Sequence, residues 1–131
     1  MQSKTQQNTK KDKKMQDFRI QLTKERERRP SGHWDTMYPL DAGSYKLSIQ
    51  ANENAYCDPR CDLDDLYGYK AFEVVIKKCY DKGTVWVHPS DIDGLHNKFS
   101  ERFCSEDNIG YCVKVKDIQE LYEFLSQKEE R

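Results

Sequence analysis

Residues able to do chemistry concentrate in the run from Tyr56 to Cys61, which contains two thiols, a carboxylate, a proline and an arginine. The run directly follows residues 45–51, where apolar and polar side chains alternate with the period of two that indicates a half-buried β-strand. Proline restricts the backbone of such a turn, and arginine adds a permanent positive charge. We predict that this rigid turn binds a macromolecular partner through Tyr56, Asp58, Pro59 and Arg60.

The two cysteines of the run allow two chemical alternatives. Thiolates and imidazoles are zinc ligands, so a structural zinc site would use Cys57, Cys61, His88 and His96, although their spacing is not specific for zinc. A catalytic Cys57 would need a lowered thiol pKa, for which Arg60 is a candidate. We predict neither a cofactor nor a catalytic residue, and a zinc-binding or Cys-dependent protein is the alternative.

The same segment is acidic, with aspartates at positions 58, 62, 64 and 65. The glycine and the final glutamate of an EF-hand calcium loop are absent from their positions. We therefore expect a solvated acidic turn that caps a short helix, because aspartate is a favoured N-cap residue. Asp58 is also placed to pair with Arg60 across the proline.

Positive and negative charges are divided along the chain, although the 131 residues have a net charge of -1. Residues 1–30 contain 10 Lys and Arg against 4 Asp and Glu, a net charge of +6, and residues 31–131 contain 12 against 19, a net charge of -7. A basic tail can bind phosphates, with an affinity that falls as salt rises. Nucleic-acid binding is therefore an alternative function, and its residues would be Lys10, Lys11, Lys13, Lys14, Arg26, Arg28 and Arg29.

The acidic body disfavours a second mode of nucleic-acid binding, in which bases stack on aromatic side chains over a basic surface. We instead expect the aromatic side chains of the body to pack in the core or across strands. The side chains concerned are Tyr45, Tyr56, Tyr67, Tyr69, Trp86 and Tyr111.

Composition indicates a small, strongly solvated intracellular domain, since 36% of the residues are hydrophobic and 34% are charged. No apolar run approaches the roughly 18 residues that span a bilayer, and the N-terminus lacks the pattern of a signal peptide. An odd number of cysteines fits reduced thiols better than a disulfide framework. We expect a cytoplasmic protein with no membrane association.

Changes in composition and in hydrophobic periodicity along the sequence divide the chain into four parts. Residues 1–14 are predicted to be a disordered basic tail, residues 15–29 an amphipathic basic helix, residues 30–44 a linker, and residues 45–128 a single α+β domain. Within the domain, strands are expected at residues 45–51, 71–78, 84–88 and 111–115, with a hairpin turn at residues 81–83. Amphipathic helices are expected at residues 90–103, with Ser90 as N-cap, and along a C-terminal face of Ile118, Leu121, Tyr122 and Leu125. The predicted fold is a mainly antiparallel sheet of about four strands with two helices on one face, plus the N-terminal basic tail and helix.

Four short motifs carry a resemblance to a family of short bacterial and phage proteins of uncharacterised function. The motifs are Ser48-Ile49-Gln50-Ala51, Tyr56-Cys57-Asp58-Pro59-Arg60, Tyr69-Lys70-Ala71-Phe72-Glu73-Val74 and Tyr111-Cys112-Val113-Lys114-Val115. The resemblance covers about residues 45–125 and implies a shared fold unit but no reaction. Because the family accepts serine at the position of Cys57, it implies that Pro59 and Arg60 are the significant residues of the turn.

These observations favour a small, non-enzymatic accessory protein of phage or mobile-element type that binds a protein partner. Inhibition of a host nuclease or of a defence complex is one form that this function would take. The basis is the small size, the absence of catalytic signatures such as a phosphate-binding glycine loop, and the charge division.

Overall fold

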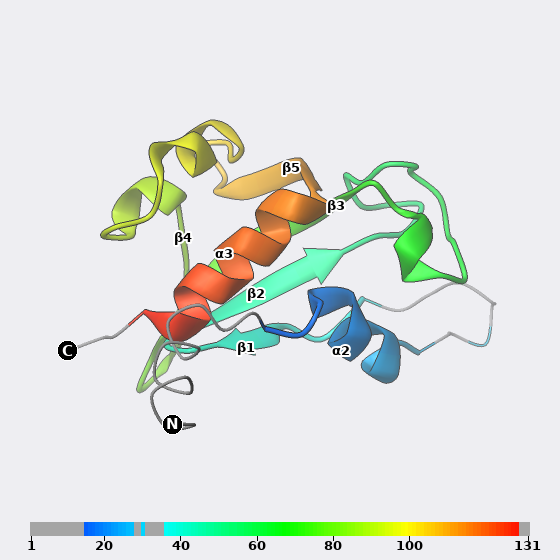
Figure 1. Cartoon of the computed structure of the whole chain (residues 1–131), viewed down its shortest axis with the longest axis horizontal. Helices are drawn as coiled ribbons and strands as arrows, with labels where there is room; N and C mark the ends of the chain where they lie inside the picture. The colour runs from blue at the N-terminus through cyan, green and yellow to red at the C-terminus, as the bar shows by residue number, and fades with distance from the viewer. Residues whose placement is uncertain (1–14, 28–29, 31–35, 129–131) are drawn as a thin grey trace, which may run out of the picture.

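A five-stranded antiparallel sheet forms the centre of the protein, and the computed structural model describes residues 15–27, 30 and 36–128. The strands are β1 (Leu40–Ala42), β2 (Tyr45–Gln50), β3 (Ala71–Tyr80), β4 (Gly83–Val87) and β5 (Ile109–Lys114) (Figure 1). They are ordered β1-β2-β3-β4, and β5 also pairs with β3. The predicted α+β fold with a mainly antiparallel sheet is confirmed.

The ten-residue strand β3 is the axis of the sheet, because three other strands pair with it. Along one side β2 runs antiparallel to it, with Leu47 opposite Ile76 and Ile49 opposite Val74. Along the other side β4 pairs with residues 76–80 and β5 pairs with residues 71–75, with an irregularity between Phe72 and Val74. One end of β3 therefore meets β5, and the other end forms the hairpin with β4.

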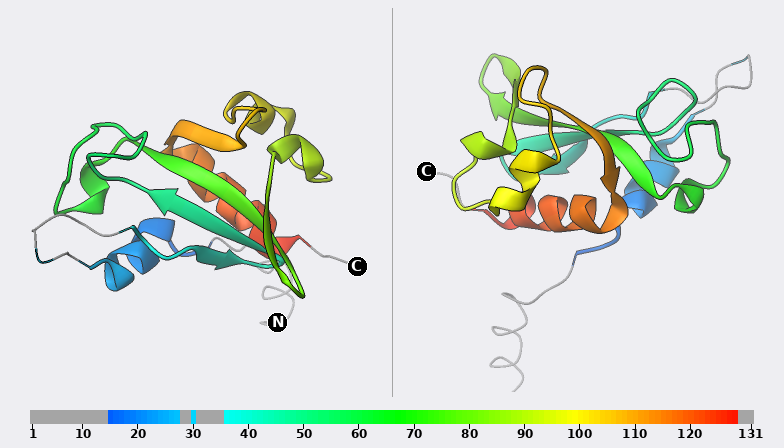
Figure 2. Two further views of the ribbon diagram at one scale, coloured as in Figure 1. Left: turned by 180° about the vertical axis from the view of Figure 1, so that it is seen from behind. Right: turned by 90° about the horizontal axis from the view of Figure 1, so that it is seen from above.

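Two α-helices, α2 (Phe18–Glu25) and α3 (Val115–Gln127), cover the same face of the sheet (Figure 2). Helix α3 buries Ile118, Leu121 and Leu125 against the strands, as the spacing of its apolar residues predicts. Helix α2 is capped by Asp17, whose carboxylate accepts a hydrogen bond from the backbone N–H of Arg19 at 2.8 Å. It docks on the body by burying two of its side chains, Phe18 and Leu22.

The helix predicted at residues 90–103 does not form. Its place is taken by two 3₁₀ turns, η2 (Pro89–Asp91) and η3 (Asn97–Glu101). Gly94 lies between them with a φ of 84°, in the left-handed region that interrupts a right-handed helix. The N-cap of η2 is His88 rather than Ser90, and His96 caps η3 in the same way. The second helix on the sheet is therefore the N-terminal α2.

The N-terminal boundaries also differ from the prediction. Helix α2 occupies eight residues of the 15–29 range, because Arg26 already has an extended backbone. Strand β1 lies inside the predicted linker 30–44, where its short length and the flanking proline and glycine concealed it. The predicted tail, residues 1–14, lies outside the described residues. Within the described part of the chain, no helix has both the length and the apolar content that a membrane crossing requires.

Candidate partner-binding site

The turn from Tyr56 to Cys61 is held against the end of the sheet by backbone hydrogen bonds. The N–H of Tyr56 donates to Oε1 of Glu73 on β3 at 2.9 Å, and its carbonyl accepts from the N–H of Cys112 on β5 at 3.0 Å. Asp58 forms a bridge with Ala71, where its N–H donates to the Ala71 carbonyl at 3.0 Å. The Asp58–Pro59 peptide bond is cis. The turn is thus joined to both strands that end beside it.

A buried tyrosine holds the far side of the same loop. The hydroxyl of Tyr69 donates to the carbonyl of Cys61 at 2.6 Å and accepts from the N–H of Leu63 at 2.8 Å. Burial raises the pKa of Tyr69, so the hydroxyl keeps the proton that it donates. Asp65 then caps the 3₁₀ turn η1 (Leu66–Gly68) by accepting from the N–H of Tyr67 at 2.9 Å, as expected for this acidic segment. These contacts give the loop one defined conformation.

Three side chains form an exposed stack on this loop and on β5. The rings of Tyr56 and Tyr111 are stacked, with centroids 4.6 Å apart and planes inclined by 15°. The guanidinium of Arg60 lies 4.7 Å from the centroid of Tyr56. Tyr111 donates its hydroxyl to the carboxylate of Asp107, which raises the pKa of Tyr111 to about 12. We call Arg60, Tyr56 and Tyr111 the aromatic stack.

The aromatic stack corrects the expected pairing of Asp58 with Arg60 and shows which aromatic side chains are exposed. Among the described residues, no ion pair joins Arg60 to Asp58, because the guanidinium lies over Tyr56 instead and its Nη2 donates only a long hydrogen bond, 3.4 Å, to the Asn54 carbonyl. The aromatic side chains divide into two groups. Tyr45 and Tyr69 are buried as expected, whereas the exposed ones are Tyr56, Tyr67, Trp86 and Tyr111.

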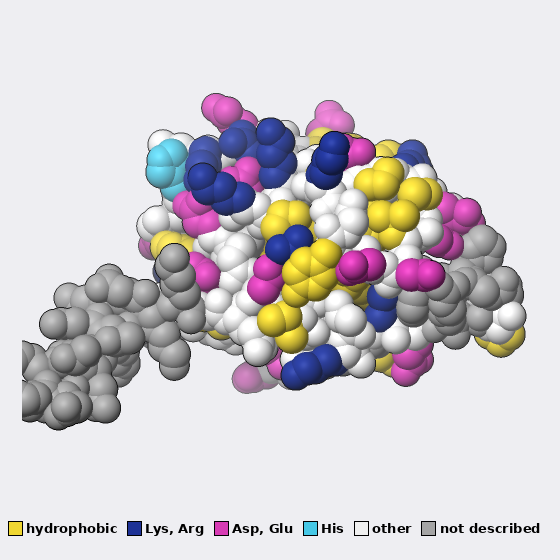
Figure 3. All heavy atoms as spheres, turned by 45° about the vertical axis from the view of Figure 1, so that its right-hand side comes forward, with side chains coloured by type: hydrophobic (Ala, Val, Ile, Leu, Met, Phe, Trp, Pro, Cys, Tyr) yellow, Lys and Arg dark blue, Asp and Glu magenta, His cyan; other side chains and the backbone are white. Residues whose placement is uncertain are grey.

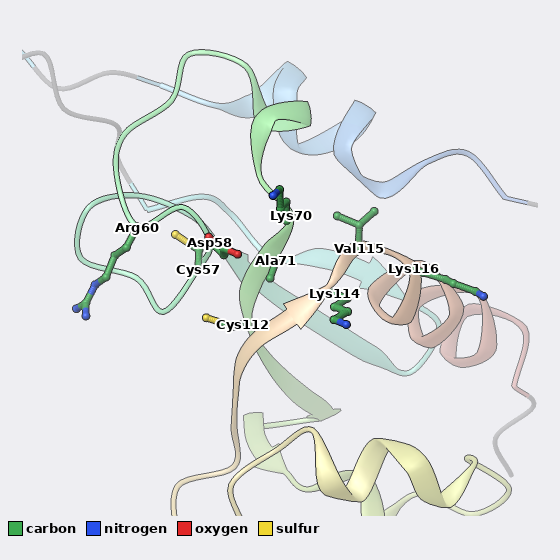
Figure 4. A pocket seen from close by; sticks show the side chains of 9 residues that line it. All are labelled: Cys57, Asp58, Arg60, Lys70, Ala71, Cys112, Lys114, Val115 and Lys116. Carbon is green, nitrogen blue, oxygen red and sulfur yellow. The ribbon is translucent and has the colours of Figure 1, made fainter.

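Beside the aromatic stack lies an open hollow of about 900 Å³, which we call the cationic groove (Figure 4). It is bounded by the turn, by the start of β3 and by the junction of β5 with α3. Its lining combines four cations and one carboxylate with small or apolar side chains, and comprises Cys57, Asp58, Arg60, Lys70, Ala71, Cys112, Lys114, Val115 and Lys116. Lys70, Lys114 and Lys116 are exposed.

The lysines of the cationic groove have no carboxylate partner among the residues that the structure describes, a property that they share with Lys77 and Lys82 near the hairpin end of β3. Near the start of α3, by contrast, the Nε of Arg102 lies 3.1 Å from Asp117, and the Nζ of Lys98 lies 2.7 Å from Glu120. Figure 3 shows one face of the molecule on which Lys and Arg side chains gather at the upper left with acidic side chains among them. The positive charge in the groove is therefore not neutralised by the fold.

The proposed zinc ligands are not brought together by the structure. Within its described residues, no group of three or more His, Cys, Asp or Glu side chains is arranged to hold a metal ion. The Sγ of Cys57 lies 3.4 Å from the carbonyls of Asn52 and Pro59, whereas Nε2 of His88 lies 3.2 Å from the carbonyl of Phe103. His96 accepts from the N–H of Lys98 as a cap.

The thiol of Cys57 also lacks the electrostatic setting of a nucleophile. Its side chain is buried, and burial raises its pKa, contrary to the lowering by Arg60 that the sequence suggested. The guanidinium of Arg60 is directed to the tyrosine ring rather than to this sulfur. Cys57 therefore acts as a small buried side chain under the turn.

The basic residues proposed for nucleic-acid binding are largely outside the described part of the chain, which holds only Arg26 of that set. Arg26 is half-buried, and its Nη1 donates to the carbonyl of Asp64 at 3.1 Å. Its side chain thus contacts the loop of the site, and a phosphate-binding role for Arg26 is not supported by this position. The lysines at positions 10, 11, 13 and 14 and the arginines at positions 28 and 29 stay predictions.

Sequence reasoning placed the turn correctly at the end of a strand but missed half of the site. The missed residues are lysines from two separate segments. Lys70 directly precedes β3, whereas Lys114 and Lys116 lie at the start of α3. Their spacing in the sequence does not indicate that they line one groove. Cys112 has a φ of 52°, a backbone strain at the β5 irregularity that no sequence pattern announced. The resemblance to bacterial and phage proteins stays a prediction, because no protein-family model matches this chain and no curated protein or solved structure is significantly similar to it.

Proposed function

We propose that this chain is a non-enzymatic interaction protein that binds a macromolecular protein partner through the face formed by the aromatic stack and the cationic groove. The observation that carries the proposal is the exposed aromatic stack itself. Tyrosine and arginine are enriched among the residues that dominate binding energies at protein interfaces. Here two tyrosines and one arginine are exposed together and in contact.

The anchoring of the turn supports the same function. An interface side chain that is ordered before binding loses little conformational entropy when the partner arrives. The backbone of Tyr56 is held by Glu73 and Cys112, and its ring lies between the ring of Tyr111 and the guanidinium of Arg60. A surface prepared in this way suits recognition of one partner, such as the nuclease or defence complex that the sequence suggested.

The proposal can be tested with a photo-crosslinking amino acid placed at one end or the other of β3. Position 70 lies at the cationic groove, and position 82 lies in the hairpin turn at the far end, about 30 Å along the strand. Both wild-type side chains are exposed lysines, so the two substitutions remove the same charge. In extract from the source cell, we expect one stoichiometric protein cross-linked from position 70 and not from position 82.

Two further variants identify the residue that matters. Arg60→Ala in the position 70 protein should lower the cross-link yield about tenfold or more, because it truncates the exposed cation of the aromatic stack. Cys57→Ser should leave the yield within about twofold, with both variants checked for an unchanged thermal melt. Equal cross-linking from positions 70 and 82, or loss with Cys57→Ser and not with Arg60→Ala, would overturn the proposal.

A further inference from the structure

We infer that the cationic groove takes an acidic peptide segment that carries an apolar side chain, an assignment that rests on the proposed function and names the chemistry of its partner. The lining of the groove combines four cations with small or apolar side chains, and Figure 4 shows Arg60 and Lys116 extending outward on opposite sides of it. An acidic segment with an apolar anchor matches both properties, because its carboxylates face the rim and its anchor faces the floor.

The rim supplies the charge complementarity. Lys70, Lys114 and Lys116 are exposed and have no carboxylate partner among the described residues. Cations at a rim raise the association rate and select partners of opposite charge. Asp58 is the single carboxylate of the lining, so the groove remains strongly positive in a body whose net charge is negative. This local reversal of sign favours an anionic partner at this place.

The floor supplies the reason for an apolar anchor. Ala71 and Cys57 are buried beneath the groove, and Val115 is half-buried at its edge. Cys112 completes this surface from β5. A leucine or phenylalanine side chain of the partner would cover the apolar surface that Cys112 and Val115 still expose, which is favourable in proportion to the area buried.

The aromatic stack argues for a peptide over a single-stranded nucleic acid. Single-strand binders offer free aromatic faces on which successive bases stack. The ring of Tyr56 is already covered by Tyr111 and by Arg60. The hydroxyl of Tyr111 is engaged as well, since it donates to the carboxylate of Asp107. An acidic peptide needs neither a free ring face nor a phosphate site.

Three fluorescent probes of matched charge test the assignment by anisotropy with the full chain. They are a peptide of alternating Glu and Leu, a peptide of alternating Glu and Ser, and a short oligothymidylate. We expect the Glu/Leu peptide to bind at least about tenfold more tightly than the Glu/Ser peptide, because only it carries apolar anchors. Its affinity should fall as the salt concentration rises from about 50 to about 500 mM.

Paired charge reversals locate the binding in the groove. Lys70→Glu with Lys114→Glu should weaken the Glu/Leu peptide about tenfold or more. Lys77→Glu with Lys82→Glu makes the same change of charge at the hairpin end of β3 and should weaken it less than about threefold. Because both pairs keep the N-terminal tail, a contribution of the tail to binding is equal in the two proteins.

Each outcome has a clear meaning. Equal affinity for the two peptides, or equal losses in the two paired variants, would overturn the groove as a site for an anchored acidic segment. Tighter binding of the oligothymidylate would assign the surface to nucleic acid instead. The cross-linking experiment can also be repeated with Lys114→Glu and Lys116→Glu, which leave position 70 free for the cross-linker. A cross-link yield that this paired variant leaves unchanged would overturn this inference, while the proposed function would stand. Absence of that cross-link would defeat the proposed function itself.

Discussion

Helix α3 begins between two groups of charged residues that behave in opposite ways. On one side Arg102 and Lys98 are paired with Asp117 and Glu120, and the Asp117 side chain is only 12% exposed. On the other side the lysines of the cationic groove face solvent without a partner among the described residues. The first group connects η3 to α3 and belongs to the stability of the fold. The lysine side chains of the second group form no ion pair among the described residues, and we propose that their charge serves to bind a partner.

The largest expected effect tests the paired side. Asp117→Ala should lower the free energy of unfolding by about 2 kcal/mol, because it removes a charged hydrogen bond with Arg102 and an acidic side chain from the first turn of a helix. Urea denaturation measures the change. The control is Glu120→Ala, since Glu120 is 45% exposed and an exposed pair contributes about 0.5 kcal/mol. Equal losses in the two variants would show that burial does not distinguish these carboxylates.

A smaller effect should appear at a second ion pair, Asp17 with Arg19. Hydrogen bonds from the Arg19 side chain hold the pKa of Asp17 below its usual value of 3.8. The carboxylate therefore stabilises the folded state above about pH 4, and this contribution is lost as the pH falls through the folded pKa. The difference in unfolding free energy between wild type and Asp17→Asn should be less than about 1 kcal/mol at pH 6 and should shrink as the pH falls below about 4. A difference that grows in acid would contradict the pairing.

A change inside the cationic groove should act on binding in the opposite direction to the lysine reversals. Asp58→Asn removes the single carboxylate of the lining while keeping the size of the side chain. The affinity for the Glu/Leu peptide should increase about two- to threefold, as expected for removal of one like charge at a solvated site. Anisotropy titrations of the two proteins at equal salt decide it. Weaker binding by Asp58→Asn would mean that the carboxylate contacts the partner directly.

The smallest expected effect is on the free energy of unfolding when a lysine of the cationic groove is replaced, and it distinguishes these lysines from the paired charges around Asp117. Lys114→Gln should change the free energy of unfolding by less than about 0.5 kcal/mol, because an exposed side chain without an ion-pair partner contributes little to the fold. The same denaturation experiment that reports on Asp117 measures it. A loss near that of Asp117→Ala would make Lys114 a structural residue and remove the distinction.

The strands and the C-terminal helix were predictable because their signals are local. The alternation through residues 45–50 and the glycine turn after β3 each specify one element without reference to the rest of the chain. The prediction of a helix at residues 90–103 was wrong because it relied on a local signal alone. Its apolar spacing was locally correct, but Gly94 and the two histidine caps divide the segment into short turns. Local periodicity cannot weigh such interruptions against tertiary packing.

The site was only partly predictable because it depends on contacts between distant residues. The turn from Tyr56 to Cys61 was visible as a motif, and its position at the end of a strand was correct. The stacking of Tyr56 on Tyr111, however, needs β5 to pair with the first half of β3. The same pairing brings Lys114 near Lys70, because Lys114 is paired with Ala71, the residue that follows Lys70. The spacing of residues along the sequence does not predict how β5 aligns with β3.

The pairing of both β4 and β5 along one edge of β3 also affects how the protein behaves in concentrated solution. An exposed strand edge is a template on which further chains can add, and a long edge is the most hazardous. Here the ten-residue strand is covered on both sides, while the strands at the margins, β1, β4 and β5, contain only three, five and six residues. The longest strand of the sheet is therefore withheld from edge-to-edge aggregation, although the margin strand β4 exposes Val85 and Trp86.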